Sequence, residues 1–499
     1  MNRRTFLASG MTPALSAGIA AKAVGYRSGF AERDISPKIG MEKPGGLGPS
    51  YHTEFHDPCK VRAAVFDDGN KRVALVGVDT VAIGRYVVQA ARKEIERRCG
   101  IAPESVLVAA SHSHSSGPVA RLHPSDYAHA SPLMQKLAQE RAGDLQYTAD
   151  VIQQIAAAVT EADRKRVPAL CGAGSGREDQ VAFNRRHRMK NGLTWTHPGK
   201  GNPDMLDYAG PVDPEVGVVG SWDASGKLLG CVVNFACHAT TSPRGISANW
   251  IYNMEQVIRG AMGPNAIVVF LPGACGDVTQ VDNRSPYAER GGENGAAYVG
   301  GRIGAEVVKT LLTMHPGVLA PIDARSTLLR LNYRVPSPGR VERSLELVRK
   351  DPKAVNAADL GFAKRALLLH ALTLKQPYEE VEVQAVQLGG AVFVTNPAEL
   401  FCRYGLDLKA KSPFPKTFPV ELANGWVGYV PTEDAFGPNG GGYETRIGVS
   451  RLETAAGTKM VNAGLELARQ LKPGVVPERP KAGPFKAPWS YGNVPPELT

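Results

Sequence analysis

The stretch VLVAASHSHSSGP, residues 106–118, joins an apolar, β-branched run to two histidines spaced two residues apart. If the strand continues through the histidines, His112 and His114 lie on one face, at the end where the sheet meets solvent. Open α/β sheets form their binding sites at strand ends, and neutral imidazole is the commonest protein ligand for metals. The pattern therefore predicts half of a zinc site. By itself it is equally compatible with two polar residues that begin a loop.

The segments before this stretch predict a βαβ-like unit. Residues 60–66 and 72–78 have the pattern of a hairpin around a DDGN turn, and the second strand ends at Asp79. Residues 86–99 have helical periodicity, and the strand at 106–110 follows. Strand, helix and strand in this order indicate an α/β architecture, with the Asp79 carboxylate where a buried strand ends.

Two later strands also end in residues that can serve a metal site. Residues 228–236 are strongly apolar and lead directly to His238. Residues 265–271 lead to a turn of small residues, 272–279, whose amides could bind an anion and whose Asp277 could orient a histidine or a water. A plain tight turn would also use glycines, so this turn alone is a weak indication.

Glu399 has two interpretations. Paired strands predicted at 380–388 and 391–395 lead to the segment NPAELF, residues 396–401, whose Asn, Pro and Glu are spaced as at a helix start. That capping box explains Glu399 without any chemistry. The alternative is a carboxylate ligand to a metal, and a glutamate bound to a metal cannot at the same time cap its helix.

Arg185 and Cys275 also have a structural and a functional interpretation. Arg185 lies in a polar segment of little periodicity, residues 179–210. Loops of that length are usually functional or disordered, although loop arginines are mostly exposed. Cys275 invites a thiol-hydrolase interpretation, but no residue near it in the sequence would lower the pKa of its thiol, which favours a packing role. The seven cysteines are far too few for a disulfide scaffold.

The N-terminus has the three parts of an export signal. Arg3 and Arg4 precede a short, small-residue apolar run, and the segment ends in Ala-Lys-Ala. We therefore predict a twin-arginine export signal over residues 1–23 and a periplasmic or secreted protein. A membrane anchor is disfavoured, because the run is short and contains Gly, Ser and Pro.

Composition excludes several classes of function. The 499-residue chain carries a formal charge of +10, and loss of Arg3, Arg4 and Lys22 with the signal leaves +7. These charges are scattered, without a basic stripe or interleaved aromatics, so nucleic-acid binding has no support. A peripheral contact with an anionic membrane surface is compatible with the net charge. Nothing in the sequence specifies an oligomeric state.

The rest of the chain completes the predicted fold. Helices are expected at 132–163 with one break, 295–313, 339–350, 358–375 and 449–471, and a further strand at 418–422. The proline-rich tail, 473–499, is expected to be extended. We predict a layered α/β domain with mixed β-sheets flanked by helices.

Five motifs in order resemble the catalytic domain of the neutral/alkaline non-lysosomal ceramidases, over nearly all of the chain after the signal. The motifs are SHSHSSGP at 111–118, NFACHAT at 234–240, GDVTQ at 276–280, PAE at 397–399, and YVPT at 429–432 followed by Tyr443-Glu444. The resemblance implies a zinc-dependent catalytic domain over residues 24–472. Only about fifty residues follow Tyr443, so we expect no C-terminal immunoglobulin-like domain.

The resemblance also implies the roles of individual residues. One zinc per chain would be held by His112, His238, Glu399 and the phenolate of Tyr429. His114, Arg185 and Tyr443 would contact the reacting amide. Asp79 and Asp277 would orient imidazoles, and Thr279 keeps the hydroxyl of the family's serine. Arg186 and Gln280 depart from the family pattern, which has Ser and Pro there.

The activity implied is hydrolysis of an N-acyl amide, as of ceramide to fatty acid and sphingosine, by attack of a zinc-bound water. His114 is a candidate to protonate the leaving amine, and Arg185 or Tyr443 to stabilise the oxyanion. The partner is then a small, lipid-like amide. Two alternatives stay open: a zinc hydrolase acting on another envelope amide or ester, and a catalytically silent binding protein of the same fold.

Overall fold

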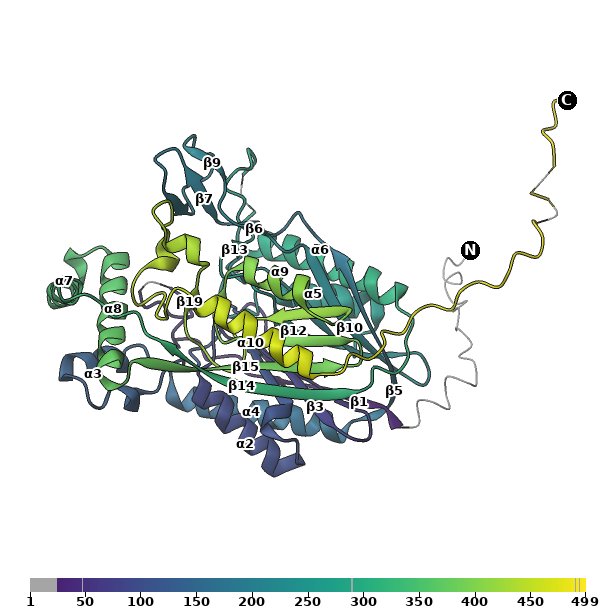
Figure 1. Ribbon diagram of the computed structural model, residues 1–499, viewed down its shortest axis with the longest axis horizontal. Coiled ribbons are helices and arrows are strands. Elements are labelled where there is room, and N and C mark those ends of the chain that lie inside the picture. Colours follow the sequence, from purple (N-terminus) through teal and green to yellow (C-terminus); the bar gives the residue numbers. More distant parts are fainter. Residues whose placement is uncertain (1–24, 47, 289, 490, 493) are drawn as a thin grey trace.

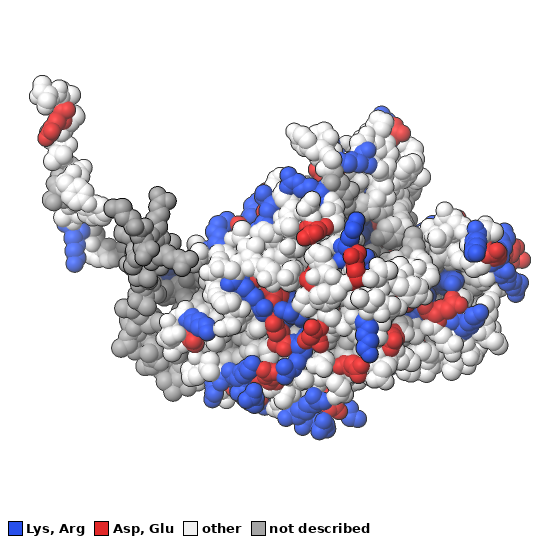
Figure 2. All heavy atoms as spheres, turned by 180° about the vertical axis from the view of Figure 1, so that it is seen from behind, with Lys and Arg blue, Asp and Glu red and all other residues white. Residues whose placement is uncertain are grey.

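The computed structural model describes residues 25–499 apart from 47, 289, 490 and 493. The predicted export signal, residues 1–23, lies outside the described residues. Among the described residues, no helix is long and apolar enough to cross a membrane. On the face shown in Figure 2, acidic and basic side chains are interspersed.

The larger sheet has eight strands in the order β12-β11-β10-β5-β1-β2-β3-β4. In chain order its strands are β1 (Arg27–Asp34), β2 (Lys60–Asp67), β3 (Arg72–Val78), β4 (Val106–Ala110), β5 (Val167–Arg177), β10 (Glu215–Asp223), β11 (Leu228–Phe235) and β12 (Ile267–Pro272). Only two residue pairs join β1 to β5, so the sheet consists of two halves. At Gly77 of β3 an added Cβ would lie 2.4 Å from the carbonyl oxygen of Phe270 in β12, which shows how closely the halves approach.

A second sheet of four strands faces both halves. Its order is β14-β15-β16-β18, with β14 (Ile322–Asn332), β15 (Tyr378–Leu388), β16 (Ala391–Thr395) and β18 (Lys416–Val420). Side chains alternate across each strand, so each wall contributes to a shared central core. Leu75 of β3, Val232 of β11 and Phe393 of β16 all belong to that core.

Helices cover the outer faces of these three walls (Figure 1). Helices α2 (Arg85–Cys99) and α4 (Leu145–Arg164) pack on the first half of the large sheet. Helices α5 (Trp250–Met262) and α6 (Gly292–Thr313) pack on the second half, and α9 (Cys402–Lys411) and α10 (Ala456–Gln470) pack on the four-stranded sheet. The predicted layered α/β fold with mixed sheets is confirmed.

Two parts project from this body in Figure 1. One is a three-stranded sheet of β7 (Arg186–Met189), β8 (Thr194–Thr196) and β9 (Met205–Tyr208). The other contains α3 (Pro132–Gln139), α7 (Pro338–Arg349) and α8 (Ala357–Lys375), which share a small core. Two short pairs complete the strands: β6 (Phe183–Asn184) with β13 (Val278–Thr279), and β17 (Glu399–Leu400) with β19 (Tyr429–Val430).

The βαβ-like unit at 60–110 is present, with β3 and β4 parallel. The expected break in 132–163 falls between α3 and α4, where Gly143 has a φ of +79°. The segment 179–210 is not the loop that its polarity indicated, because it contains β6 to β9. The tail from 473 has no helix or strand among its described residues and leaves the body of the protein (Figure 1).

Candidate active site

Three parallel strand pairs direct their carboxyl ends to one place. These pairs are β3–β4, β11–β12 and β16–β18. Ligand-capable side chains follow them: His112 after β4, His238 after β11, and Glu399 after β16. One donor atom from each of the three lies within 4.8 Å of the others, and all three residues are buried. The strand-end argument thus brings the three predicted ligands together.

His112 does not reach this place by strand alternation. Strand β4 ends at Ala110, and His112 has a φ of +64°, a left-handed conformation that few non-glycine residues adopt. Its Nδ1 lies 2.7 Å from the carbonyl oxygen of Val81, which leaves Nε2 facing Glu399. The imidazoles of His112 and His114 converge, with 3.3 Å between their Nε2 atoms, because of this turn and not because of a shared strand face.

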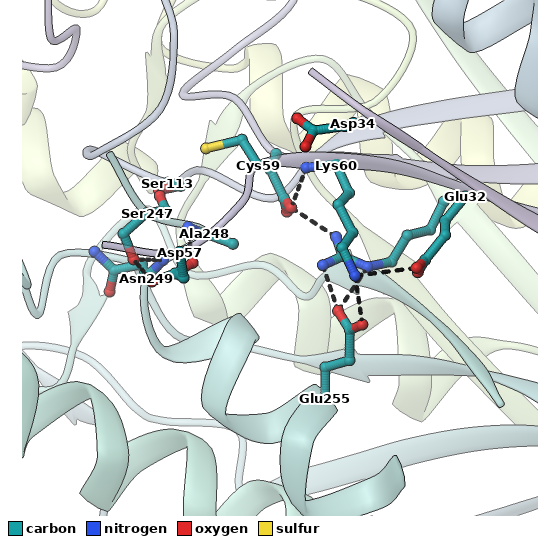
Figure 3. Close-up of polar contacts among 12 residues, drawn as sticks. Glu32, Asp34, Asp57, Cys59, Lys60, Ser113, Ser247, Ala248, Asn249 and Glu255 are labelled. Carbon is teal, nitrogen blue, oxygen red and sulfur yellow. Dashed lines mark hydrogen bonds and ion pairs between the residues drawn. The ribbon is translucent and has the colours of Figure 1, made fainter. Parts of the chain in front are cut away.

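Buried hydrogen bonds on the side away from the cluster hold the loop that carries these histidines. The Ser113 hydroxyl donates to the carbonyl oxygen of Ser247 at 2.8 Å. Ser247 and the backbone N–H of Ala248 in turn donate to the Asp57 carboxylate (Figure 3). Ser113, Ser247 and Asp57 thus form a connected series of buried hydrogen bonds, which holds the histidine loop against the segment 247–248.

His238 is placed mainly through its backbone. Its N–H donates to the carbonyl oxygen of Val278 at 3.1 Å, and its own carbonyl accepts from Nε1 of Trp250 at 3.1 Å. Its Nδ1 is buried without a hydrogen-bond partner among the described residues. Burial and the charge of Arg185 lower the pKa of His238 to about 3, and burial also lowers the pKa of His112. Both imidazoles are therefore neutral at pH 7, with nitrogen lone pairs available.

Glu399 lies in a short strand, and the predicted helix start at 396–401 is wrong. Helix α9 begins only at Cys402, whereas the N–H of Glu399 donates to Gly428 and β17 pairs with β19. The Asn396 side chain accepts from the N–H of Ala398, so the apparent cap forms a turn. The Glu399 carboxylate is free for the site: Oε2 lies 3.5 Å from Nε2 of His112 and 3.7 Å from Nε2 of His238.

The glycine before Asp277 serves this strand. A Cβ on Gly276 would lie 2.4 Å from the carbonyl oxygen of Glu399, so only glycine allows the two segments to meet. Although burial alone would raise the pKa of Glu399, hydrogen bonding to His238 and the proximity of His112 hold it below its ordinary value. Glu399 is thus a carboxylate beside two neutral imidazoles.

Tyr429, Tyr443 and Arg185 complete the cluster. The hydroxyl of Tyr429 lies 3.4 Å from Nε2 of His238 and 3.2 Å from the hydroxyl of Tyr443. The Arg185 guanidinium donates to the Glu444 carboxylate at 2.9 Å and to the carbonyl of Gly276 at 2.8 Å. A further nitrogen, Nη1, lies 3.3 Å from Nε2 of His238. The solvated-loop interpretation of Arg185 is wrong, because its side chain is buried at the site.

Charge explains why Arg185 keeps its proton there. Burial alone would lower its pKa, but Tyr443, Tyr429 and the carboxylate of Glu444 together raise it well above the ordinary value. Burial and Glu399 raise the pKa of Tyr429, so its phenol is neutral unless a cation binds beside it.

The structure places the three predicted supporting residues around the ligands but not in contact with an imidazole. Asp79 accepts hydrogen bonds from the N–H of Lys60 and the guanidinium of Arg62, and the carbonyl of Val81 orients His112 instead. Asp277 accepts from the Asn184 amide and from the N–H of Cys402, which fixes the segments that carry Arg185 and Glu399. Thr279 accepts from the N–H of Val281.

A buried glutamate behind Glu399 was not predicted. Glu421 is inaccessible to solvent and accepts hydrogen bonds from the N–H groups of Cys275 and Leu400 and from the Cys275 thiol. Burial raises the pKa of Glu421 to about 8, and burial beside Glu421 raises the pKa of Cys275 well above its ordinary value. A neutral, inaccessible thiol is not a nucleophile, in agreement with the packing role favoured for Cys275.

A cavity of about 310 Å³ opens directly onto the cluster. It is lined by Gly45, Val81, His112, His114, Arg121, Arg141, Phe362, Arg365, Glu399, Trp426, Tyr429, Tyr443, Gly448 and Val449. Gly45 adjoins His114 so closely that a Cβ there would lie 2.4 Å from its Nδ1. Arg121, Arg141 and Arg365 were not predicted, because only the packing of separate segments brings them to this cavity.

Comparison with known proteins concerns the fold. No protein-family model and no curated protein sequence match the chain. A solved structure described as a ceramidase complexed with C2 superposes with a TM-score of 0.66 at 16% identity, over 91% of this chain and 77% of that one. The neutral ceramidase of Pseudomonas aeruginosa superposes with a TM-score of 0.65 at 18% identity, over 91% and 76% of the two chains.

The chain has the neutral ceramidase fold. The resemblance predicted from five short motifs is thereby confirmed at the level of the fold. At sequence identities below 20%, a shared fold does not establish a shared reaction. The chemistry has to be argued from the side chains of this chain.

Within this neutral ceramidase fold, the donor set fits a zinc ion. Two neutral imidazoles and a carboxylate converge within 4.8 Å, with the Tyr429 hydroxyl 3.4 Å from one of the imidazole nitrogens. Nitrogen and oxygen donors of this kind and number are those of catalytic zinc sites. The carbonyl of Val81 fixes the orientation of His112, as is usual for a histidine that binds a metal.

Proposed function

We propose that this protein is a zinc-dependent hydrolase that cleaves the amide bond of an N-acyl lipid of the ceramide type. The observation that carries the proposal is the convergence of His112, His238 and Glu399 at the cavity. In the reaction, water adds across the carbon–nitrogen bond. Its hydroxyl goes to the acyl carbon and its proton to the amine, which gives a fatty acid and a free amine.

The proposed ligands are His112, His238, Glu399 and Tyr429, with one zinc per chain. Zinc bound by such a set supplies an activated water at neutral pH and polarises the substrate carbonyl. The resemblance to ceramidases supports the choice of substrate, since one solved structure of the same fold is described as a ceramidase complexed with C2.

The residues of the chain around this centre have separable roles. His114 lines the cavity, and burial together with His112 and His238 lowers its pKa well below the ordinary value. As a neutral imidazole it can accept a proton and pass it to the leaving nitrogen. Arg185 stays cationic and, with the Tyr443 hydroxyl, can donate hydrogen bonds to the developing oxyanion.

The decisive experiment compares metal content with turnover. We expect the purified wild type to contain about one zinc per chain and to release amine from N-acyl sphingosine. His238→Ala should lose both, since His238 supplies one of the four proposed ligands. His114→Ala should keep its zinc and lose turnover. Equal zinc in the wild type and in His238→Ala would overturn the proposed metal site.

We also propose that the chain is exported by the twin-arginine route, on the basis of Arg3, Arg4 and the apolar run that follows. Replacement of both arginines by lysine should block export. Cell fractionation of that variant beside the wild type measures this, and normal export of the lysine variant would contradict the route.

A further inference from the structure

Three arginines line the cavity without a charged partner. Arg121 follows the histidine loop, Arg141 lies between α3 and α4, and Arg365 lies on α8. Within the described part of the chain, none of the three guanidinium groups takes part in an ion pair, and none donates a hydrogen bond. Their contacts are with aromatic faces: Arg121 lies 5.4 Å from the ring of Trp426, and Arg365 lies 6.0 Å from that of Phe362.

The acidic groups nearby do not neutralise these charges. Glu399 faces two histidines at 3.5 and 3.7 Å, and it is a proposed metal ligand. Glu42 is the other acid whose charge reaches Arg121 and Arg141. Two carboxylates thus face three guanidiniums and, in the loaded enzyme, a divalent cation.

The pKa values reflect this excess of positive charge. Burial and the charges of Arg365 and Arg121 lower the pKa of Arg141 to about 9, and burial lowers the pKa of both other arginines. An arginine normally keeps its proton under all conditions and is buried only with a partner. A cavity that holds three arginines without partners is therefore complementary to an anion.

The remaining wall of the cavity is apolar. Val81, Phe362, Trp426 and Val449 line it together with the catalytic cluster. One cavity thus offers an apolar surface, a hydrolytic centre and three cations. A ligand that matches all three has an acyl chain, an amide and a negative charge.

We propose that the substrate is an N-acyl amine whose head group is anionic, with a carboxylate, sulfonate or phosphate held by Arg121, Arg141 and Arg365. This inference rests on the proposed amidohydrolase function and refines its substrate class. A neutral ceramide offers these arginines only hydroxyl groups, whereas an anion can accept bidentate hydrogen bonds from guanidinium groups. The amine product keeps the anionic group, and the fatty acid is released from the opposite side of the broken bond.

Equilibrium binding to the metal-free protein tests the arginines apart from turnover. The probes share one acyl chain: N-dodecanoyl glycine, N-dodecanoyl taurine and phosphorylated N-dodecanoyl ethanolamine, with neutral N-dodecanoyl ethanolamine as reference. Titration calorimetry should show at least one anionic probe binding about tenfold or more tightly than the neutral one, since a hydrogen bond to a charged group contributes more than a neutral one. The best probe identifies the head group.

Matched variants assign the preference to the cavity. Arg121→Gln, Arg141→Gln and Arg365→Gln should each reduce the preference, and the triple variant should abolish it, while Arg365→Lys should retain part of it. Lys364→Gln is the control, because Lys364 adjoins Arg365 on α8 but pairs with Glu140 at 2.8 Å and does not line the cavity. Zinc content and thermal unfolding of each variant show that the fold is intact.

Turnover of the zinc-loaded enzyme separates this inference from the proposed function. We expect a higher kcat/KM for the anionic amide, with the Gln variants slowed more on that substrate than on the neutral one. Equal binding and equal kcat/KM for both classes would overturn the head-group inference and leave the hydrolase standing. An equal loss on both substrates would assign the arginines to bond cleavage and also overturn it. Absence of any amide hydrolysis, with zinc bound, would overturn the proposed function.

Discussion

Two groups of arginine in this protein have opposite surroundings. Arg62 on β2 donates to Asp79 at 2.6 Å and to Glu255 at 2.5 and 2.9 Å, and Lys60 donates to Glu255 at 2.9 Å. Figure 3 labels Lys60 and the Glu255 carboxylate of this network. Arg121, Arg141 and Arg365, by contrast, line the cavity without an ion pair among the described residues.

The comparison distinguishes Arg62, whose charge is neutralised within the fold, from the cavity arginines, whose charges are available to a ligand. Arg62 is 2% exposed, and its carboxylate partners raise its pKa although burial alone would lower it. Burial lowers the pKa values of Arg121 and Arg141, and the charge of Arg365 lowers both further. Removing a paired buried charge leaves its partners buried without a counter-charge, which destabilises the fold. Removing an unpaired charge only removes its repulsion with neighbouring charges of the same sign.

The largest expected effect is on Arg62. Arg62→Met leaves Asp79 and Glu255 buried without their guanidinium, and we expect a loss of about 3 to 5 kcal/mol in the free energy of unfolding. Urea denaturation of the metal-free protein measures it. A loss below about 1 kcal/mol would mean that the network does not stabilise the fold.

Arg185 is paired, like Arg62, but it lies beside a proposed metal ligand: it pairs with Glu444, and its Nη1 is 3.3 Å from Nε2 of His238. Arg185→Ala should slow turnover by roughly a hundredfold or more, about 3 kcal/mol, as for other single oxyanion donors. Zinc content should not change, because Arg185 is not a ligand. Steady-state kinetics and elemental analysis on the same preparation check both statements; zinc loss would instead make Arg185 a residue that supports the metal site.

Low pH should reduce the stabilisation that comes from the network of Arg62 and Glu255. Although burial alone would raise it, Arg62, Lys60 and Arg259 lower the pKa of Glu255 to about 2. A carboxylate with a depressed folded-state pKa stabilises the protein above its unfolded pKa, and this contribution is lost as the pH falls from about 4.5 towards 2. We expect at most about 3 kcal/mol from this group. The pH dependence of unfolding in that window should be shallower in Glu255→Gln; an unchanged slope would contradict the assignment.

The smallest effect should come from the unpaired group. Arg365→Met removes a cation that repels Arg121 and Arg141, so the free energy of unfolding should change by less than about 1 kcal/mol and can rise. The same urea experiment as for Arg62→Met gives the comparison directly. Similar losses in the two variants would show that Arg365 has a structural partner after all.

Much of this architecture could be predicted from the sequence, because its signals are local. The hairpin at 60–78, the helix at 86–99 and the strand at 106–110 have strong periodicity and match the structure closely. Strands β5 and β14 were not predicted. Both have partly exposed, mixed sequences whose pairing is decided by neighbouring strands.

The site residues that follow a strand within a motif could be predicted from the sequence. Those whose position depends on contacts between distant segments could not. His112, His238 and Glu399 follow buried strands and lie together as expected. The capping-box spacing at 396–399 led to the wrong prediction of a helix start, because pairing of β17 with β19 overrides the local helix preference. Arg141 and Arg365 have no local signal, since only the packing of distant segments makes them neighbours.

Three of the four proposed ligands also connect the walls of the central core. His112 follows the first half of the large sheet, His238 follows the second half, and Glu399 follows the four-stranded sheet. Long stretches of chain separate them, so an ion bound to all three would close two large loops, as a covalent cross-link does, and reduce the entropy of the unfolded chain. Chelation should therefore do more than stop turnover: the folded metal-free protein should be less resistant to proteases across all three walls than the zinc-bound protein.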